Sequence, residues 1–536
     1  MTTTVQLDPK ERQLKRLLLD TAAYIDTIND QSVCKGASSN GKQTGQQISD
    51  DKLVLRWAGG WVRDKLLGRQ SHDIDVAINA MTGEAFGEAL RDFCGVPENI
   101  KKHDLQKQDI GNIHKIEKNP EKSKNLETAT VKIFGLDVDF VNLRTETYAE
   151  DSRNPQMEFG TAEEDARRRD ATVNALFYNI HTDEVEDFVG GLEDMHAKII
   201  RTPMDPFQTF MDDPLRVLRL VRFASRLGFT LEPNVKVYMG DESVLNALQA
   251  KISRERVGVE VEKMLKGEHP RDAVHYIDEL GLYHTVFTDP AKQDMPTPDL
   301  AGWNTTYEFL DGLSEHALYN KLVTSDEERY LAWVLACIVP FARVPGQVSR
   351  SENLKKNRPL ATQAAREGIK APNKVSELVT AAWLHLAEIA ELKDLVCSGN
   401  ERMHERDYLG MAIRRWDAQG KHWRLQVLFA MLDDVMTKSK ESPQTASTLV
   451  EIRNDWQVFI DQIQKLDLID APAIQPMIDG RMLSKAFGIK PGKWLSPALD
   501  VCMAWQLRNP QESDPAGAIE EVRRRQEELG IAQLLQ

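Results

Sequence analysis

The hydrophobic and polar positions of the chain follow two different periods. Up to about Gly190, short apolar runs rich in β-branched and aromatic residues alternate with turn residues and helical stretches, which predicts strands mixed with helices. Beyond Gly190 the apolar positions recur at helical spacing. The pattern therefore predicts an α+β fold, in which a head with a mixed or antiparallel sheet precedes an all-helical remainder. The segments with strand character are LVLRWA, HDIDVAIN, TATVKIF, LDVDFVNLR, ALFYNI and EVEDF.

The length of the chain divides it further. A chain of 536 residues is too long for one ordinary core. We expect a head at 1–190, a helical neck at 191–285, a helical body at 286–470 and a helical tail at 471–536. Within the head, the lysine-rich polar stretch 101–125 predicts a long loop, and such loops are often functional.

Composition narrows the class of protein. Hydrophobic residues make up 41% of the chain, which favours packed cores over global disorder. The formal net charge is −15, so any nucleic-acid binding must use a local basic surface. The five cysteines form no CxxC pair, which argues against a zinc site or a disulfide framework and fits a reducing compartment. No apolar run is long enough for a transmembrane helix and the N-terminal segment lacks a secretory core, so we expect no membrane association.

A pair of glycines and a pair of aspartates form the first candidate site. Gly59 and Gly60 lie between a predicted strand and a predicted helix, where glycine lets the backbone approach a phosphate. Asp73 and Asp75 follow in a strand, and strand residues two apart point to the same face. Two carboxylates on one face are costly unless a cation neutralises them, and Mg²⁺ is usually held by one or two carboxylates together with substrate phosphates. The combination indicates phosphoryl or nucleotidyl transfer; the alternative is a solvated strand edge with two exposed aspartates.

A second cluster, in RRDATVNAL, contains Arg168, Arg169, Asp170 and Asn174. A triphosphate needs permanently charged donors, and arginine supplies planar, bidentate ones. An aspartate accepts a hydrogen bond from a ribose 2′-OH, which would favour ribonucleotides over deoxyribonucleotides. The alternative is a charge cluster at the start of a helix that forms surface ion pairs.

A third motif, MDDPLR, places Asp213 and Arg216 on one helical face. Arginine offers only donors and a carboxylate only acceptors, so the pair matches the Watson–Crick edges of cytosine and adenine. Uracil and guanine would leave buried groups unpaired. A compatible second interpretation is that Asp213, followed by Pro214, caps a helix. Arg219 and Arg222 continue the basic face and are further candidates for the same pocket.

The three motifs occur in an order that resembles a known family. GGWVRDKLLGRQSHDIDVAIN resembles motif A of the class II tRNA nucleotidyltransferase and poly(A) polymerase family, within the polymerase-β-like superfamily. RRDATVNAL resembles motif B, and MDDPLR resembles motif D with Asp212 in place of the usual Glu. DFVGGLEDM resembles motif C, whose glycines either permit a hinge or form a helix-capping turn, and SRERVGVEVEKML resembles motif E, which we treat as structural first. The resemblance covers about Leu53 to Leu265. Within it, the amino-acid sequence is similar to that of eukaryotic, particularly fungal, members.

The resemblance implies a polymerase-β-like nucleotidyltransferase head that adds C, C and A to the 3′ end of tRNA from CTP and ATP without a template, releasing pyrophosphate. It implies that Asp73 and Asp75 are catalytic and hold two Mg²⁺ ions, with Asp139 as a possible third ligand and Asp137 as its competitor. It implies that Asp213 and Arg216 read the base. The implied triphosphate- and ribose-binding residues are Gly59, Gly60, Arg63, Arg168, Arg169, Asp170 and Asn174.

Partners and location follow from the same resemblance. The tail segment DGRMLSKAFGIKPGKWL suits phosphate contacts with tRNA at a helix N-terminus through Arg481, Lys485, Lys490 and Lys493. A poly(A) polymerase of the same family and a catalytically silent RNA-binding factor on the same fold remain as alternatives. We expect the protein in cytoplasm and nucleus, with a mitochondrial form through an alternative start. The sequence does not fix the oligomeric state, and a monomer is the working expectation. The loop 101–125 is the candidate for the switch from C to A.

Overall fold

The computed structural model describes most of the chain. The described residues are 4–34, 52–106, 108–112, 114–116, 128–147, 155–291, 296–344, 358–418, 420, 422–441 and 446–532. They form two compact units, one made of Met1–Glu260 with Leu280–Thr285 and the other of Val261–Glu279 with Val286–Gln536. The finer division into head, neck, body and tail remains a prediction from the sequence.

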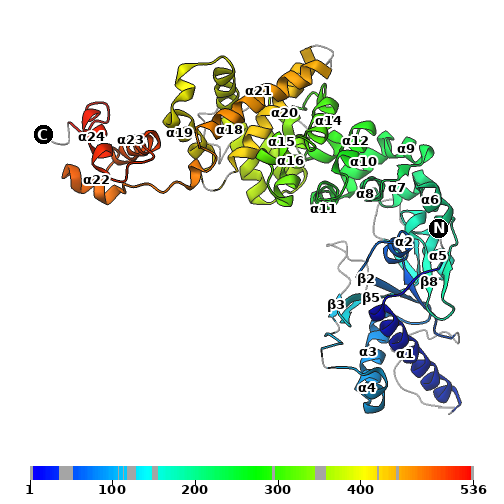
Figure 1. Cartoon of the computed structure of the whole chain (residues 1–536). Helices are drawn as coiled ribbons and strands as arrows, with labels where there is room; N and C mark the ends of the chain where they lie inside the picture. The colour runs from blue at the N-terminus through cyan, green and yellow to red at the C-terminus, as the bar shows by residue number, and fades with distance from the viewer. Residues whose placement is uncertain are drawn as a thin grey trace. The chain divides into compact units, whose positions relative to one another are not determined.

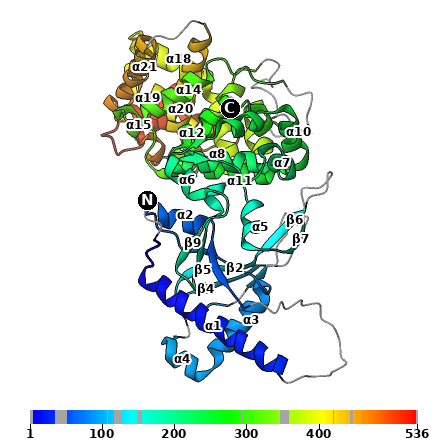
Figure 2. The same ribbon diagram turned by 90° about the vertical axis from the view of Figure 1, so that its right-hand side faces the viewer.

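A seven-stranded sheet forms the centre of the first unit (Figures 1 and 2). Its strands are β1 (Leu55–Ala58), β2 (Asp73–Ile78), β3 (His114–Ile116), β4 (Thr128–Ile133), β5 (Leu136–Asn142), β8 (Phe177–Asn179) and β9 (Glu184–Glu186). Their spatial order is β3-β4-β5-β2-β1-β8-β9. β2 and β5 are parallel neighbours and the other neighbouring pairs are antiparallel. The predicted mixed sheet is therefore confirmed.

One face of this sheet is apolar and covered by helices. Alternate residues of a strand point to opposite faces, and Ile74, Val138 and Phe140 share the face that is fully buried. The ring of Phe140 lies 4.9 Å from that of Phe86 in the covering helix. The covering helices are α3 (Gly83–Gly95), which packs on β4 and β5, and α1 (Pro9–Cys34), which packs on α3 and β1. The odd-numbered residues of β2 and β5, which include the aspartates, consequently point to the other face.

The predicted long loop at 101–125 is only partly a loop. Pro97 starts the helix α4 (Pro97–His103), which runs through the first two lysines of the stretch and ends where Asp104 adopts a left-handed conformation with φ 49°. His114–Ile116 forms the edge strand β3. Residues 107, 113 and 117–125 lie outside the described residues.

The rest of the first unit consists of a hairpin and short helices. The hairpin joins β6 (Arg144–Thr147) to β7 (Gln156–Phe159). The helices are α2 (Gly60–Leu66), α5 (Ala162–Arg167), α6 (Gly191–Ala197), α7 (Pro206–Asp212), α8 (Leu215–Leu227), α9 (Pro233–Met239), α10 (Glu242–Lys251) and the start of α11 (Arg254–Leu265). The predicted neck is not wholly helical, because β10 (Ile199–Ile200) and β11 (Thr230–Leu231) form a short parallel pair. Two-residue strands are too short for an alternating pattern to reveal.

The second unit is helical. Its main helices are α12 (Pro270–Glu279), α14 (Trp303–Leu313), α15 (Ala317–Leu322), α16 (Asp326–Ile338), α18 (Asn373–Cys397), α19 (Arg406–Trp416), α20 (Trp423–Glu441), α21 (Ala446–Lys465), α22 (Gly480–Phe487), α23 (Leu495–Arg508) and α24 (Ala516–Arg524). In the part of the chain that the structure describes, every helix is too short or too polar to span a bilayer.

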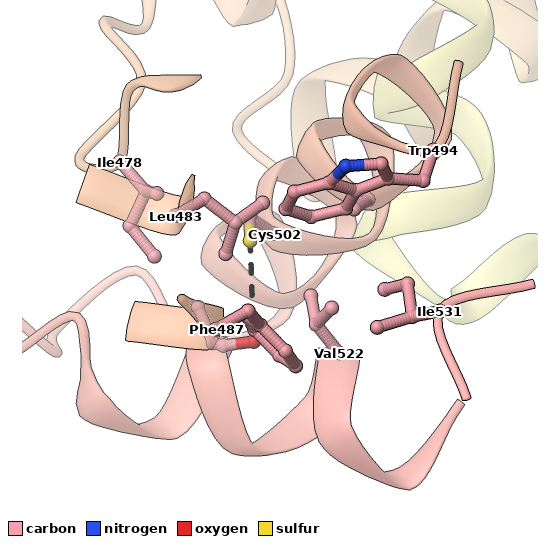
Figure 3. Packing of buried hydrophobic residues seen from close by; sticks show 9 residues of the cluster. Ile478, Leu483, Phe487, Trp494, Cys502, Val522 and Ile531 are labelled. Carbon is pink, nitrogen blue, oxygen red and sulfur yellow. Dashed lines mark hydrogen bonds between the residues drawn. The ribbon is translucent and has the colours of Figure 1, made fainter. Parts of the chain in front are cut away.

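The three C-terminal helices have a core of their own (Figure 3). Leu483 of α22, Cys502 of α23 and Val522 of α24 are buried together in it, and the Cys502 thiol lies 4.0 Å from the carbonyl oxygen of Ala518. Helix α23 also packs on α19, where Arg406 donates to the carbonyl of Leu507 at 3.1 Å. The tail is therefore a packed element of the second unit.

Candidate active site

A cavity of about 580 Å³ in the first unit brings the sequence-predicted residues together. Its walls come from β2, β5, β6, α2, α8, α11 and the segments that follow β1 and α5. The predicted residues that line it are Gly59, Gly60, Arg63, Asp73, Asp75, Arg168, Arg169, Asp170, Asn174, Asp213, Arg216, Arg219 and Arg222. Motifs that are up to 163 positions apart thus share one cavity, while Asp139 lies beside it.

The aspartates of β2 and β5 form a crowded row. In the parallel register, Asp75 lies opposite Asp139 and Asp73 opposite Asp137. Burial raises the pKa of Asp73, and Asp139 and Asp137 raise it further. The pKa of Asp75 is raised to about 6 by burial, with Arg169 opposing the shift and Asp73 and Asp139 adding to it. Asp75 is reachable by solvent within the cavity but has protein on most sides.

The carboxylate row fits a hard divalent cation. Such ions prefer oxygen ligands, and a cation would offset both the burial and the mutual repulsion that raise these pKa values. Asp139 is half-buried beside Asp75, whereas the exposed Asp137 is paired with Lys132 at 2.9 Å, which favours Asp139 as a third ligand. Within the described ranges, no three His, Cys, Asp or Glu side chains are already arranged around one point for a metal ion.

The side chain of Arg169 packs directly against the glycine turn. Gly59 has φ +69°, and a Cβ atom there would lie 2.8 Å from Nη1 of Arg169. Arg169 is fixed across the turn because its Nε donates to Asp165 at 3.0 Å and its Nη1 donates to the carbonyl of Asn174 at 3.0 Å. Its guanidinium also lies 4.9 Å from the centre of the Phe177 ring. Glycine is therefore required at position 59 by the arginine as well as by the turn.

The buried carboxylates of Asp165 and Glu146 bind the arginines around the second motif. Asp165 is ion-paired with both Arg168 and Arg169. Burial would raise the pKa of Asp165, but Arg169 and Arg168 outweigh it and lower the pKa. Glu146 accepts from Arg168 at 2.9 Å and from Arg144 at 2.8 Å. These pairs are largely buried at the cavity, so the cluster is not the exposed ion-pair network that the alternative interpretation required.

Arginines of two different helices, α8 and α2, bind Asp170 and Asn174. Asp170 pairs with Nε of Arg219 at 2.5 Å. Burial would raise its pKa, but Arg219 outweighs burial and the pKa falls to about 2. The side-chain oxygen of Asn174 accepts from Nη1 of Arg63, whose Nε is bound to Asp64 at 2.8 Å. Asp170 is therefore an ionised acceptor at neutral pH.

Asp213 has an extended backbone just before α8, so it is not on a helical face with Arg216 as predicted, but its carboxylate binds the start of that helix. Its Oδ1 accepts from the Leu215 N–H at 3.2 Å, at the start of α8. Its Oδ2 accepts from Nη2 of Arg256 at 3.2 Å. Nη2 of Arg216 donates to the carbonyl of Arg168 at 2.9 Å. Both predicted base readers are thus tethered to other residues of the cavity wall.

Sequence reasoning did not assign several lining residues to the site, among them Arg144, Glu146, Phe223, Arg226 and Arg256. Arg226 continues the helical spacing of the arginines on α8 and could have been found from it. Arg144 and Glu146 lie two positions apart on the short strand β6 and belong to no motif. Arg256 lies in the segment treated as structural. For Arg144, Glu146 and Arg256, only the tertiary fold shows that they reach the cavity.

The glycines of DFVGGLEDM form a capping turn. The carboxylate of Asp187 accepts from the N–H groups of Gly191 and Leu192, each at 2.9 Å. A Cβ atom on Gly191 would lie 2.4 Å from the carbonyl oxygen of Thr172. The glycine is needed for close packing, which favours the capping interpretation over the hinge.

The predicted tRNA-binding residues lie in the second unit. Arg481, Lys485, Lys490 and Lys493 are all exposed. At the N-terminus of α22, Asp479 already accepts from the first free N–H groups, at 2.9 and 2.8 Å, so these donors are not available to a phosphate. A carboxylate cap both occupies these donors and repels a phosphate. The exposed side chains themselves remain the predicted contact.

Comparison with known proteins agrees with this architecture. Residues 55–201 match the family model of the poly A polymerase head domain, and residues 228–293 match that of a probable RNA and SrmB-binding site of polymerase A. The chain is 49% identical to the nucleotidyltransferase lcsQ of Purpureocillium lilacinum, over 98% of this chain and 93% of that protein. It is 36% identical to the mitochondrial CCA tRNA nucleotidyltransferase of Candida glabrata, over 95% and 94%. A solved structure of a CCA-adding enzyme in an apo form matches 97% of this chain and 96% of its own with a TM-score of 0.63 at 17% identity, which supports the fold.

The fold and the cavity are together those of a nucleotidyltransferase. The chain belongs to the tRNA nucleotidyltransferase and poly(A) polymerase family, on its eukaryotic class II, CCA-adding branch.

Proposed function

We propose that the chain adds C, C and A in turn to the 3′ end of tRNA. The tRNA 3′-OH attacks the α-phosphate of CTP, twice, and then that of ATP, and pyrophosphate leaves at each step. The observation that carries the proposal is one cavity that is lined by two strand aspartates, by an arginine cluster and by the Asp213/Arg216 pair. The sequence similarity to a CCA tRNA nucleotidyltransferase of Candida glabrata over nearly the whole chain supports the same activity.

Different residues of the cavity bind the triphosphate, the ribose and the base of the nucleotide. Arg168 and Arg169 supply fixed, permanently charged donors for the triphosphate. Asp170, held ionised by Arg219, accepts a hydrogen bond from the ribose 2′-OH. Asp213 and Arg216 read the Watson–Crick edge of the base. Each group is already oriented by a neighbour, so binding requires little rearrangement.

Asp73 and Asp75, with Asp139 as the third candidate, would hold two Mg²⁺ ions. When bound, these ions supply charge neutralisation at the phosphates and activation of the attacking hydroxyl. The chain's own contribution is to keep the carboxylates in one row on rigid neighbouring strands. Ionisation of Asp75 is disfavoured in the free protein, so cation binding should release protons near pH 6.

Nucleotide addition with single nucleotides tests the proposal. A tRNA lacking its CCA end should gain two nucleotides from CTP alone, and a tRNA ending in CC should gain one from ATP. Neither should be extended by UTP or GTP. Extension by many A residues with none by CTP would instead indicate a poly(A) polymerase. A folded protein that incorporates no nucleotide in the presence of Mg²⁺ would indicate a silent RNA-binding factor.

Replacing Asp75 tests the carboxylate row. Asp75→Asn should lower kcat for CTP and ATP by at least about a hundredfold. The same change removes a charge that burial and neighbouring carboxylates disfavour, so the melting temperature without metal should stay the same or rise. The exposed and lysine-paired Asp137 provides the matched control, and Asp137→Asn should keep most activity. Equal loss of activity in both variants would contradict the assignment.

We further propose that tRNA contacts the exposed basic residues of the tail and that the chain acts as a monomer. We propose the cytoplasm and the nucleus as its locations, with a mitochondrial form from an alternative start; the relative from Candida glabrata is named as mitochondrial.

A further inference from the structure

We propose that Arg256 of α11 is a positioning residue that fixes the carboxylate of Asp213 and thereby contributes to the choice of C and A over U and G. The inference rests on the proposed function, because it takes Asp213 to be a reader of the nucleobase. It adds a residue outside the base-reading motif to the machinery of selection.

The contact between Arg256 and Asp213 lies at the surface of the cavity. Nη2 of Arg256 lies 3.2 Å from Oδ2 of Asp213, and the two side chains are 28% and 20% exposed. The other oxygen, Oδ1, accepts from the Leu215 N–H at 3.2 Å. Each carboxylate oxygen has further lone pairs, so acceptors remain for the exocyclic amino group of cytosine or adenine.

Helix α11 is anchored on both sides of Arg256. Arg254 is buried, and its Nη1 donates to the carbonyl of Thr285 at 2.9 Å. Glu260 lies one helical turn after Arg256 and accepts from Nε of Arg222 on α8 at 2.5 Å. The helix therefore holds Arg256 in place relative to α8, at whose start Asp213 lies.

The chemistry of base reading depends on such a tether. Discrimination between an amino group and a carbonyl requires an acceptor whose direction is fixed, because a carboxylate that turns away leaves room for water. The guanidinium of Arg256 also offsets the negative charge of Asp213 in a cavity that must receive a triphosphate. Loss of Arg256 should therefore weaken selection as well as binding.

Steady-state kinetics with each nucleotide tests the role. Arg256→Gln should lower kcat/KM for CTP and for ATP about tenfold, and should lower the preference for CTP over UTP about tenfold. Arg256→Lys keeps a cation near Asp213 and should recover part of the preference. Val259, 46% exposed on the same helix, provides the control, and Val259→Ala should change neither quantity.

A double variant separates positioning from a general structural effect. If Arg256 acts through Asp213, then adding Arg256→Gln to Asp213→Asn should cost little beyond Asp213→Asn alone. A fully additive loss, or an equal fall for all nucleotides with unchanged CTP/UTP preference, would overturn the inference. A wild-type enzyme that does not extend tRNA with CTP would instead overturn the proposed function, so the two failures are distinguishable.

Discussion

The ion pair between Asp170 and Arg219 shows how single residues of the cavity depend on one another. Asp170 is nearly buried, and an unpaired carboxylate would be costly there. Arg219 outweighs the cost of burial and holds the pKa at about 2. In turn, Asp170 is the main cause of the raised pKa of Arg219. The pair therefore keeps both groups charged before any nucleotide arrives.

This pair predicts a defined pH dependence of stability. The pKa of Asp170 lies below its ordinary value, so its contribution is complete above pH 4 and is lost as the pH falls toward 2. The shift corresponds to about 2 kcal/mol. Denaturant unfolding of the wild type and of Asp170→Asn should differ by a constant amount from pH 7 to 5, and the difference should shrink below pH 4. A difference that is the same at pH 3 as at pH 7 would show that the ion pair does not stabilise the fold.

At the scale of an element, the turn between β1 and α2 couples backbone shape to an arginine. Gly59→Ala should destabilise the protein by about 1–3 kcal/mol, because its backbone conformation is strained for any other residue. It should also lower kcat/KM for CTP, because the added methyl group would displace Arg169. Melting temperature and steady-state kinetics measure the two effects.

Gly68 offers a matched control for that turn. It also has positive φ, +72°, but a Cβ atom there would meet nothing within 4 Å. Gly68→Ala should therefore reduce stability with little change in activity. If both variants lose activity alike, the contact with Arg169 does not explain the glycine.

The helices and strands also show how much of the fold and of the candidate site could be predicted from the sequence. The six segments with strand character carry strong local signals, and the structure has strands in them, whereas β3 and β7 were not predicted. The cap by Asp479 was predictable from its position before a helix, and was missed because nearby lysines suggested a phosphate site. Glu146, which pairs with Arg168, lies on another element, and no spacing along the chain indicates it. Arg256 lies in a segment that resembles a motif, but its contact with Asp213 could not be predicted from the sequence.

At the scale of the whole molecule, the chain is acidic, and its proposed RNA contact depends on a few exposed lysines of the tail. Replacing Lys490 and Lys493 together by Glu should weaken tRNA binding. It should also make the slope of log K against log salt less steep by about two, if each lysine contacts one phosphate. KM for CTP should stay unchanged at saturating tRNA, because these residues lie outside the nucleotide cavity.

A single charge reversal elsewhere tests whether a change in net charge alone alters tRNA binding. Lys10 is exposed on α1 in the first unit, and Lys10→Glu should leave the salt slope unchanged. Filter binding or fluorescence anisotropy across a salt series measures both. An equal effect of the two reversals would assign tRNA binding to overall charge and not to the tail.

The parallel pairing of β2 with β5 has a consequence for how this family can vary. The two carboxylate-bearing strands are neighbours in the sheet, but the chain between Ile78 and Leu136 is long. The entropy of closing such a segment rises only with the logarithm of its length, so doubling it costs about 0.6 kcal/mol. Insertions in its loops, outside α3 and β4, should leave the carboxylate row almost undisturbed. Evolution could thus lengthen these loops while the chemistry of the row stays the same.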